Sequence, residues 1–143
     1  MVTGMALVRA IRDEQAEPPS GIRTLGLDRT HRWLRSVEPG RVLLDWLVDD
    51  AYLNLEGAVI CSWIAALGDQ ALFFAASTLC ADGEGTRMAQ FDVRLLENIT
   101  GGSVAVEARV LRRVEDRLHC ECSFTVDGDL KALMIATIDV VPA

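Results

Sequence analysis

The feature that most constrains this chain is a long apolar run, residues 59–79, with one carboxylate, Asp69, near its middle. The run is long enough for a transmembrane helix, which needs about 20 apolar residues. Three observations oppose a membrane span. A charge at the centre of a bilayer is costly, no positive cluster flanks either end, and the rest of the chain has the pattern of amphipathic strands. We therefore expect a helix, roughly residues 57–77, that is wrapped by its own protein.

Alternation of apolar and polar residues predicts strands on both sides of this helix. One strand precedes it, at residues 41–50, and four follow it, at residues 88–96, 103–113, 117–126 and 130–141. The last of these is apolar on both faces, which predicts that it is central in the sheet or buried by a partner. Asp127-Gly128 predicts a hairpin turn, since both residues tolerate a positive φ. The expected fold class is α+β, with an antiparallel sheet wrapped around one long helix.

The N-terminal part of the chain carries weaker signals. Residues 1–20 look like an extension that is mobile or partly helical, and the Pro-Pro pair at 18–19 separates it from a single domain at residues 21–143. A short helix is expected at residues 28–36, with Asp28 as its N-cap. The first twenty residues become charged too early for a secretion signal, so we expect a cytoplasmic protein with reduced thiols.

Charge and cysteine usage exclude several kinds of partner. The formal net charge of -7 argues against nucleic acid, whose phosphates need a positive field. None of the four cysteines forms a Cys-x-x-Cys pair, and neither histidine groups with them at the spacing of metal ligands. We expect no metal site, no nucleic-acid partner and no membrane partner.

Few polar residues interrupt the predicted helix, and two of them share a face. Ser62 and Asp69 are seven residues apart, about 10 Å along a helix axis. Asn54 and Glu56 lie just before the helix. The start of a helix offers unpaired N–H groups and a partial positive charge, which suit a carbonyl oxygen that gains negative charge in a reaction.

The segment NLEGAVICSWIAALGDQA, residues 54–71, resembles the helix-opening motif of hotdog-fold thioesterases of the phenylacetic-acid-degradation type, the PaaI-like thioesterases. That motif is approximately N-x-x-G-x-x-H-G-G, with L-x-D ending seven residues after the second glycine. Asn54, Gly57, Leu67 and Asp69 are in register with it without a gap. The resemblance extends over roughly residues 39–141 and implies the hotdog fold.

The resemblance implies an acyl-CoA or acyl-carrier thioesterase with coenzyme A as part of its substrate and no other cofactor. Asp69 would be the general base or nucleophile, Asn54 would position water or the thioester, and the Ser62 N–H would polarise the carbonyl. The site would span a homodimer, alone or in a dimer of dimers. The substrate-binding positions implied are Gly57, Cys61, Thr86 and Gln90.

The strand after the helix holds the polar residue that often completes such a site. Thr86, Met88 and Gln90 are expected on one strand face. An alignment without gaps puts Met88 at the family's polar position, so Thr86 or Gln90 would take that role if the loop before the strand shifts.

Ile60-Cys61-Ser62 stands where the family has His-Gly-Gly, which keeps a second function open. This is a non-catalytic hotdog dimer that binds an acyl or hydrophobic ligand, or a protein partner. A third possibility, a hotdog dehydratase or hydratase, ranks last because no histidine lies near the helix.

Overall fold

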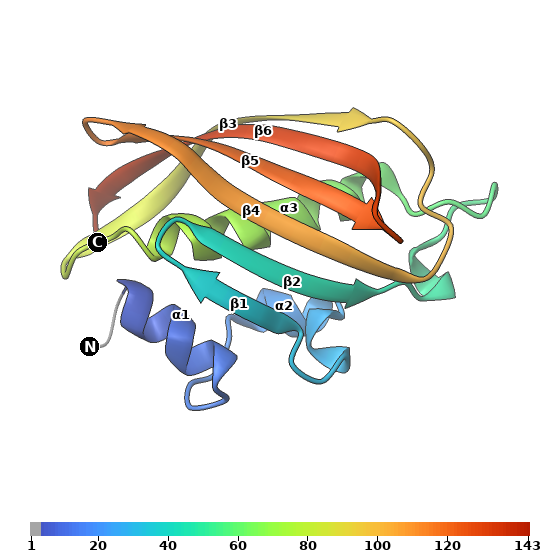
Figure 1. Cartoon of the computed structure of the whole chain (residues 1–143), viewed down its shortest axis with the longest axis horizontal. Coiled ribbons are helices and arrows are strands. Elements are labelled where there is room, and N and C mark those ends of the chain that lie inside the picture. The colour runs from blue at the N-terminus through green and yellow to red at the C-terminus, as the bar shows by residue number, and fades with distance from the viewer. Residues whose placement is uncertain (1–3) are drawn as a thin grey trace.

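One long helix lies in the curve of a six-stranded antiparallel sheet (Figure 1). The computed structural model describes residues 4–143. The sheet order is β1-β2-β4-β5-β6-β3, and every neighbouring pair is antiparallel. The strands are β1 (Leu34–Glu38), β2 (Arg41–Leu47), β3 (Glu84–Leu95), β4 (Ser103–Val114), β5 (Arg117–Val126) and β6 (Asp129–Pro142). The helices are α1 (Gly4–Arg12), α2 (Ser20–Thr24) and α3 (Cys61–Ser77), with 3-10 turns η1 (Leu27–Arg29) and η2 (Asp50–Tyr52).

The central helix α3 is the expected apolar helix. It contacts β2, β3, β4, β5 and β6, and Leu67, Ala71, Leu72 and Phe74 are almost fully buried against them. Burial of a helix on most of its sides needs an apolar sequence all round, which explains why the run of residues 59–79 imitates a membrane span. Among residues 4–143, no helix has the length and hydropathy needed to cross a membrane.

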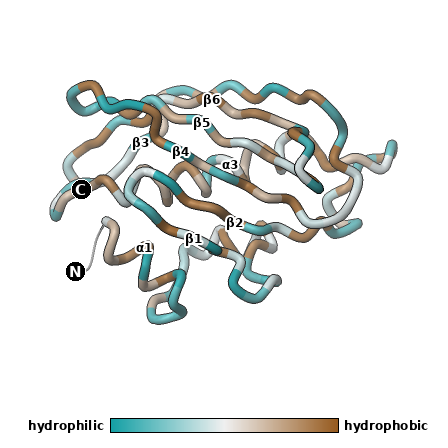
Figure 2. Tube along the Cα trace, in the orientation of Figure 1, coloured by the Kyte–Doolittle hydropathy of each residue, from teal (hydrophilic) through white to brown (hydrophobic). Residues whose placement is uncertain are grey.

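The sheet follows the alternation of the sequence. Along β4 and β5, buried apolar residues alternate with more exposed ones, and Figure 2 shows the matching change of hydropathy from residue to residue. Cys120 and Cys122 are buried on the helix side as free thiols. Asp127 and Gly128 have φ values of 50° and 83° and close the β5–β6 hairpin. β6 lies between β5 and β3, which confirms its predicted interior position.

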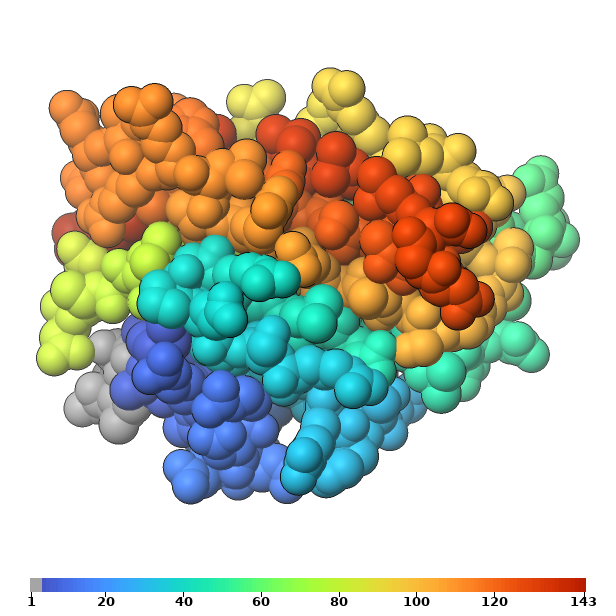
Figure 3. Space-filling model, in the orientation of Figure 1, coloured from blue at the N-terminus to red at the C-terminus, as the bar shows by residue number. Residues whose placement is uncertain are grey.

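The outer face of the sheet carries ion pairs between neighbouring strands. Arg41 of β2 pairs with Glu107 of β4, and Arg109 of β4 pairs with Glu121 of β5. In the space-filling view the strands face the viewer and hide most of α3 (Figure 3). The side chains of this face therefore pair with one another in solvent, while the helix side of the sheet provides the core.

The helix expected at residues 28–36 is wrong. Residues 27–29 form the turn η1, and residues 34–38 form β1. β1 contains a bulge: Leu34 pairs with Leu44 and Ser36 pairs with Leu43, so Arg35 is the extra residue. The bulge puts the buried residues Leu34 and Val37 three positions apart, which is the spacing of a helix face.

The N-terminal segment packs on the domain. Within residues 4–20, α1 buries Val8 and Ile11 and contacts β1 and α3. The partly helical structure expected for residues 1–20 is present in α1, and the first three residues of that extension lie outside the described residues. α1 therefore lies along the β1 side of the sheet (Figure 1).

A buried threonine connects the end of α3 to the β1–β2 turn. The Thr78 hydroxyl donates to the Ala75 carbonyl at 2.6 Å and accepts from the Gly40 N–H at 2.7 Å. We predict that Thr78→Val lowers the free energy of unfolding by about 1–3 kcal/mol, because the buried Gly40 N–H loses its acceptor. Urea denaturation measures the change. Thr100→Val, at an exposed loop position, is the matched control and should change it by less than about 0.5 kcal/mol.

Candidate active site

Asp69 lies at a hollow between the middle of α3 and the edge of the sheet. The hollow has a volume of 180 Å³. Its lining residues come from three elements: Asp69, Gln70 and Phe73 from α3, Thr86 and Met88 from β3, and Ile138 from β6. One side chain with a charge and two with neutral polar groups thus share a small space with three apolar ones.

The Asp69 carboxylate makes no hydrogen bond or ion pair with the side chains and backbone of residues 4–143. It is half-buried, and this burial raises the pKa of Asp69 above the usual aspartate value. Asp45 and Asp139 differ from Asp69 because the pKa of each is lowered, and arginine partners contribute to that lowering. A partly desolvated carboxylate without an internal partner is a suitable general base.

A β-bulge decides which residues of β3 face Asp69. Met88 pairs with Ile138 and Gln90 pairs with Thr137, so Ala89 is an extra residue. Thr86 and Met88 therefore face the helix and line the hollow, whereas Gln90 lies on the outer face of the sheet. The expectation that Gln90 shares a face with Thr86 and Met88 is wrong, because the bulge reverses the alternation between them.

The first turn of α3 presents two backbone donors. Ile60 is the N-cap residue, and α3 begins at Cys61, four residues later than expected. The N–H groups of Cys61 and Ser62 have no acceptor within residues 4–143, and both residues are exposed. These are the unpaired donors that every helix start leaves. The geometry keeps Ser62 available as a backbone donor.

Aromatic stacking fixes the start of α3. The Trp63 ring stacks on Tyr52 at 4.5 Å between centroids, and Tyr52 lies 5.3 Å from the buried Trp46. The Ile60 N–H donates to the Tyr52 carbonyl at 3.0 Å. The sequence pattern did not single out Tyr52, because the contact depends on how the chain folds back from β2 to α3.

Asn54 has a structural task in the loop before α3. Its side-chain oxygen accepts from the N–H groups of Glu56 and Ala58, at 2.9 and 3.2 Å. Gly57 completes the same turn with a φ of 77°. Asn54 therefore shapes the loop that leads into α3. Its side-chain oxygen contacts that loop and not Asp69.

Ser62 and Asp69 are too far apart to act together on one carbonyl group within one chain. Seven helical residues separate them by about 10 Å along the axis. A base and an oxyanion donor must both lie about 3 Å from the reacting groups. Ser62 and Asp69 of one chain therefore cannot both contact the same reacting carbonyl group.

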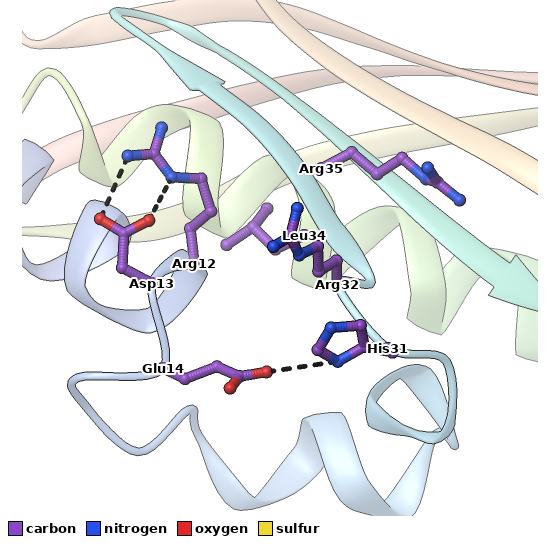
Figure 4. Close-up of a pocket in the computed structure, with 7 residues that line it drawn as sticks. All are labelled: Arg12, Asp13, Glu14, His31, Arg32, Leu34 and Arg35. Atoms are coloured by element: carbon purple, nitrogen blue, oxygen red, sulfur yellow. Dashed lines mark hydrogen bonds and ion pairs between the residues drawn. The ribbon is translucent and has the colours of Figure 1, made fainter.

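A larger hollow of 510 Å³ lies between the end of α1 and the start of β1 (Figure 4). Arg12, Arg32 and Arg35 line it, together with acidic neighbours. Arg12 bonds both carboxylate oxygens of Asp13, and Arg35 bonds Asp45 of β2 at 2.5 Å. The His31 Nδ1 atom lies 3.7 Å from the Glu14 Oε1 atom. Because its charges are mostly paired and exposed, this hollow lacks the unpartnered reactive group that the Asp69 hollow has.

The described residues contain no group of side chains suited to hold a metal ion.

The raised pKa of Asp69 predicts how stability depends on pH. A carboxyl group whose pKa is higher in the folded state stabilises the fold when protonated, and this contribution is lost as the pH rises through that pKa. We expect Asp69→Asn to be more stable than the unchanged protein at neutral pH. The difference should shrink as the pH falls through the raised folded-state pKa of Asp69, and it should be gone below about 4, where both states protonate Asp69. Urea denaturation at both pH values measures it, and a less stable Asp69→Asn protein at neutral pH would contradict the prediction.

Solved structures with the same architecture come from several bacteria, although no family model and no curated protein matches this sequence. A putative thioesterase from Ralstonia eutropha, related to phenylacetic acid degradation, has a TM-score of 0.83 and 23% identity over 94% of this chain and 99% of its own. The Escherichia coli PaaI protein of the phenylacetic acid degradation operon has a TM-score of 0.81 and 14% identity, covering 97% of this chain and 96% of its own. A Streptococcus mutans protein bound to acetyl-CoA has a TM-score of 0.69 and 20% identity, covering 75% and 86%. The chain therefore has the hotdog fold that its sequence predicts.

Proposed function

We propose that this protein is a thioesterase that hydrolyses acyl-CoA or acyl-carrier thioesters, with Asp69 as its catalytic carboxylate. The observation that carries the proposal is the Asp69 side chain itself, which is half-buried beside a hollow and has no partner within residues 4–143. The similar structures from Ralstonia eutropha and the phenylacetic acid operon support this reaction class, and the acetyl-CoA bound to the Streptococcus mutans protein supports a CoA-type ligand.

In the proposed reaction, water attacks the thioester carbonyl carbon while the Asp69 carboxylate takes up a proton from that water. The carbonyl oxygen gains negative charge and accepts a hydrogen bond from the Ser62 N–H. Collapse of the tetrahedral intermediate breaks the carbon–sulfur bond and releases a carboxylic acid and a thiolate. The thiolate takes up the proton held by Asp69 and leaves as the thiol, which restores the Asp69 carboxylate. Direct attack by Asp69 remains the alternative, in which water then hydrolyses an anhydride.

The reaction requires Asp69 of one chain and Ser62 of another, because the two groups are too far apart in one helix. The edge strand β3 offers a surface for a second copy. Phe91 and Leu95 lie on the helix side of β3 after its bulge and are 49% and 47% exposed. The unpaired backbone N–H and C=O groups of an edge strand and its exposed apolar side chains favour association with another chain. The other edge strand, β1, already has α1 packed beside it. We propose a homodimer across β3.

Substitution of Asp69 tests the catalytic proposal. We expect Asp69→Asn to lower kcat by about 10²- to 10⁴-fold for the acyl-CoA thioester that the protein hydrolyses best, because the base is removed while the shape is kept. A thiol-trapping assay of released CoA measures the rate. Asp116→Asn, on the exposed β4–β5 turn, is the control and should keep the full rate. An unchanged rate in Asp69→Asn would reject Asp69 as the catalytic group.

The same assay separates the proposal from its alternative. If the purified protein hydrolyses no acyl-CoA or acyl-carrier thioester yet binds such ligands saturably, it is a non-catalytic hotdog protein. The replacement of His-Gly-Gly by Ile60-Cys61-Ser62 is the feature that favours this second function.

Ser62 variants test whether the donor is the backbone N–H. Proline has no N–H and is tolerated in the first turn of a helix. We therefore expect Ser62→Pro to lower kcat by about 10²- to 10³-fold, while Ser62→Ala keeps most of the rate because its N–H remains. Comparable losses in both variants would point to the hydroxyl instead.

Mixed dimers of Asp69→Asn and Ser62→Pro chains extend this test. A site built from two chains regains one intact pair in each mixed dimer, so co-expression should restore activity that neither variant has alone. A site within one chain would stay inactive in every mixture.

A further inference from the structure

We propose that Phe73 limits the length of the acyl group, so that this protein acts on short acyl chains. The inference rests on the proposed function, because it takes the Asp69 hollow as the place of the acyl group. It assigns Phe73 a role in specificity, with no part in the chemical step.

The position of Phe73 on α3 supports this role. Phe73 follows Asp69 by four residues, so the two side chains lie on one helix face about 5–6 Å apart at their Cβ atoms. Both line the hollow, with Met88 and Ile138 on the sheet side. An acyl group whose carbonyl is held at Asp69 and whose chain extends toward the C-terminal end of α3 therefore meets the Phe73 ring one helical turn later.

The surroundings of the hollow support this wall on its inner side. The Phe73 ring packs against Phe74 at 5.6 Å between centroids, and Phe74 is fully buried and in contact with the Trp33 ring at 6.0 Å. Phe73 therefore has no room to turn inward. Ile138, on the sheet side, is only 2% exposed and belongs to the packed core. Ile138 cannot give way without disturbing the core, whereas the Phe73 ring is 38% exposed and keeps freedom on its solvent side.

The size and polarity of the hollow indicate the ligand class. Its 180 Å³ corresponds to about six water-sized units at roughly 30 Å³ each. Three of the six lining side chains are polar, and the other three, Phe73, Met88 and Ile138, offer apolar surface to a hydrocarbon group. No lysine or arginine lines the hollow to receive a second carboxylate. A saturated acyl group of about six carbons or fewer fits this space, whereas a chain of ten carbons exceeds it.

The test compares straight-chain thioesters of increasing length. The probes are butyryl-, hexanoyl-, decanoyl- and dodecanoyl-CoA, with kcat/KM as the readout. We expect kcat/KM to fall by about tenfold or more between hexanoyl- and decanoyl-CoA, since a misfit of one or more methylenes costs a factor of about 10–200. Phe73→Ala should remove this drop, and Phe73→Trp should move it to shorter chains. Ile135→Ala, on the outer face of β6, is the control and should keep the original profile.

A binding measurement keeps this inference separate from the proposed reaction. Thioether analogues, S-hexyl-CoA and S-decyl-CoA, cannot be hydrolysed, and titration calorimetry gives their Kd. If no thioester is hydrolysed but S-hexyl-CoA binds about tenfold more tightly than S-decyl-CoA, and Phe73→Ala abolishes the difference, the size limit holds and the proposed reaction fails. Equal Kd values for both analogues, or a length profile unchanged in folded Phe73→Ala and Phe73→Trp proteins, would overturn the inference.

Discussion

The close approach of α3 to the sheet at Gly68 determines where the candidate site lies. A Cβ atom at this position would come within 2.4 Å of the Met134 sulfur and 3.1 Å of the Phe124 ring. Any larger residue would force the buried Met134 or Phe124 side chain to shift, so the glycine lets the helix lie this deep in the curve of the sheet. Successive helical residues are about 100° apart, so when Gly68 faces the sheet, Asp69 faces its edge. The depth of the helix thereby holds Asp69 half-buried beside β3, instead of in the core or in open solvent.

The sequence predicts the helix, the sheet and the position of Asp69 because those features follow regular periods. Prediction from the sequence fails where a β-bulge breaks the alternation of apolar and polar residues. The bulge at Arg35 gives β1 the spacing of a helix, and the bulge at Ala89 moves Gln90 to the outer face. Neither bulge has a glycine or proline to mark it. Met88 pairs with Ile138, and this pairing closes one wall of the hollow. The register between two strands cannot be deduced from a single sequence.

Residues that look catalytic by position divide into two groups in the structure. Asp69 makes no hydrogen bond or ion pair within residues 4–143, whereas the Asn54 side-chain oxygen accepts from two backbone N–H groups of its own loop. Asn54 shapes the loop that leads to Ile60, Cys61 and Ser62 at the start of α3. The stack of Tyr52 on Trp63 supports the same segment from the other side.

The two edges of the sheet differ in a way that matches the needs of the site. β1 is short and has α1 packed beside it, while β3 has twelve residues and leaves Phe91 and Leu95 exposed. An open edge is normally a liability, since it invites pairing with another chain. Here the open edge belongs to the strand that carries Thr86 and Met88, beside the Asp69 carboxylate, which has no donor partner among the described residues. Pairing at β3 would bury the exposed side chains and bring a second α3 toward Asp69, so the same contact would stabilise the edge and complete the site.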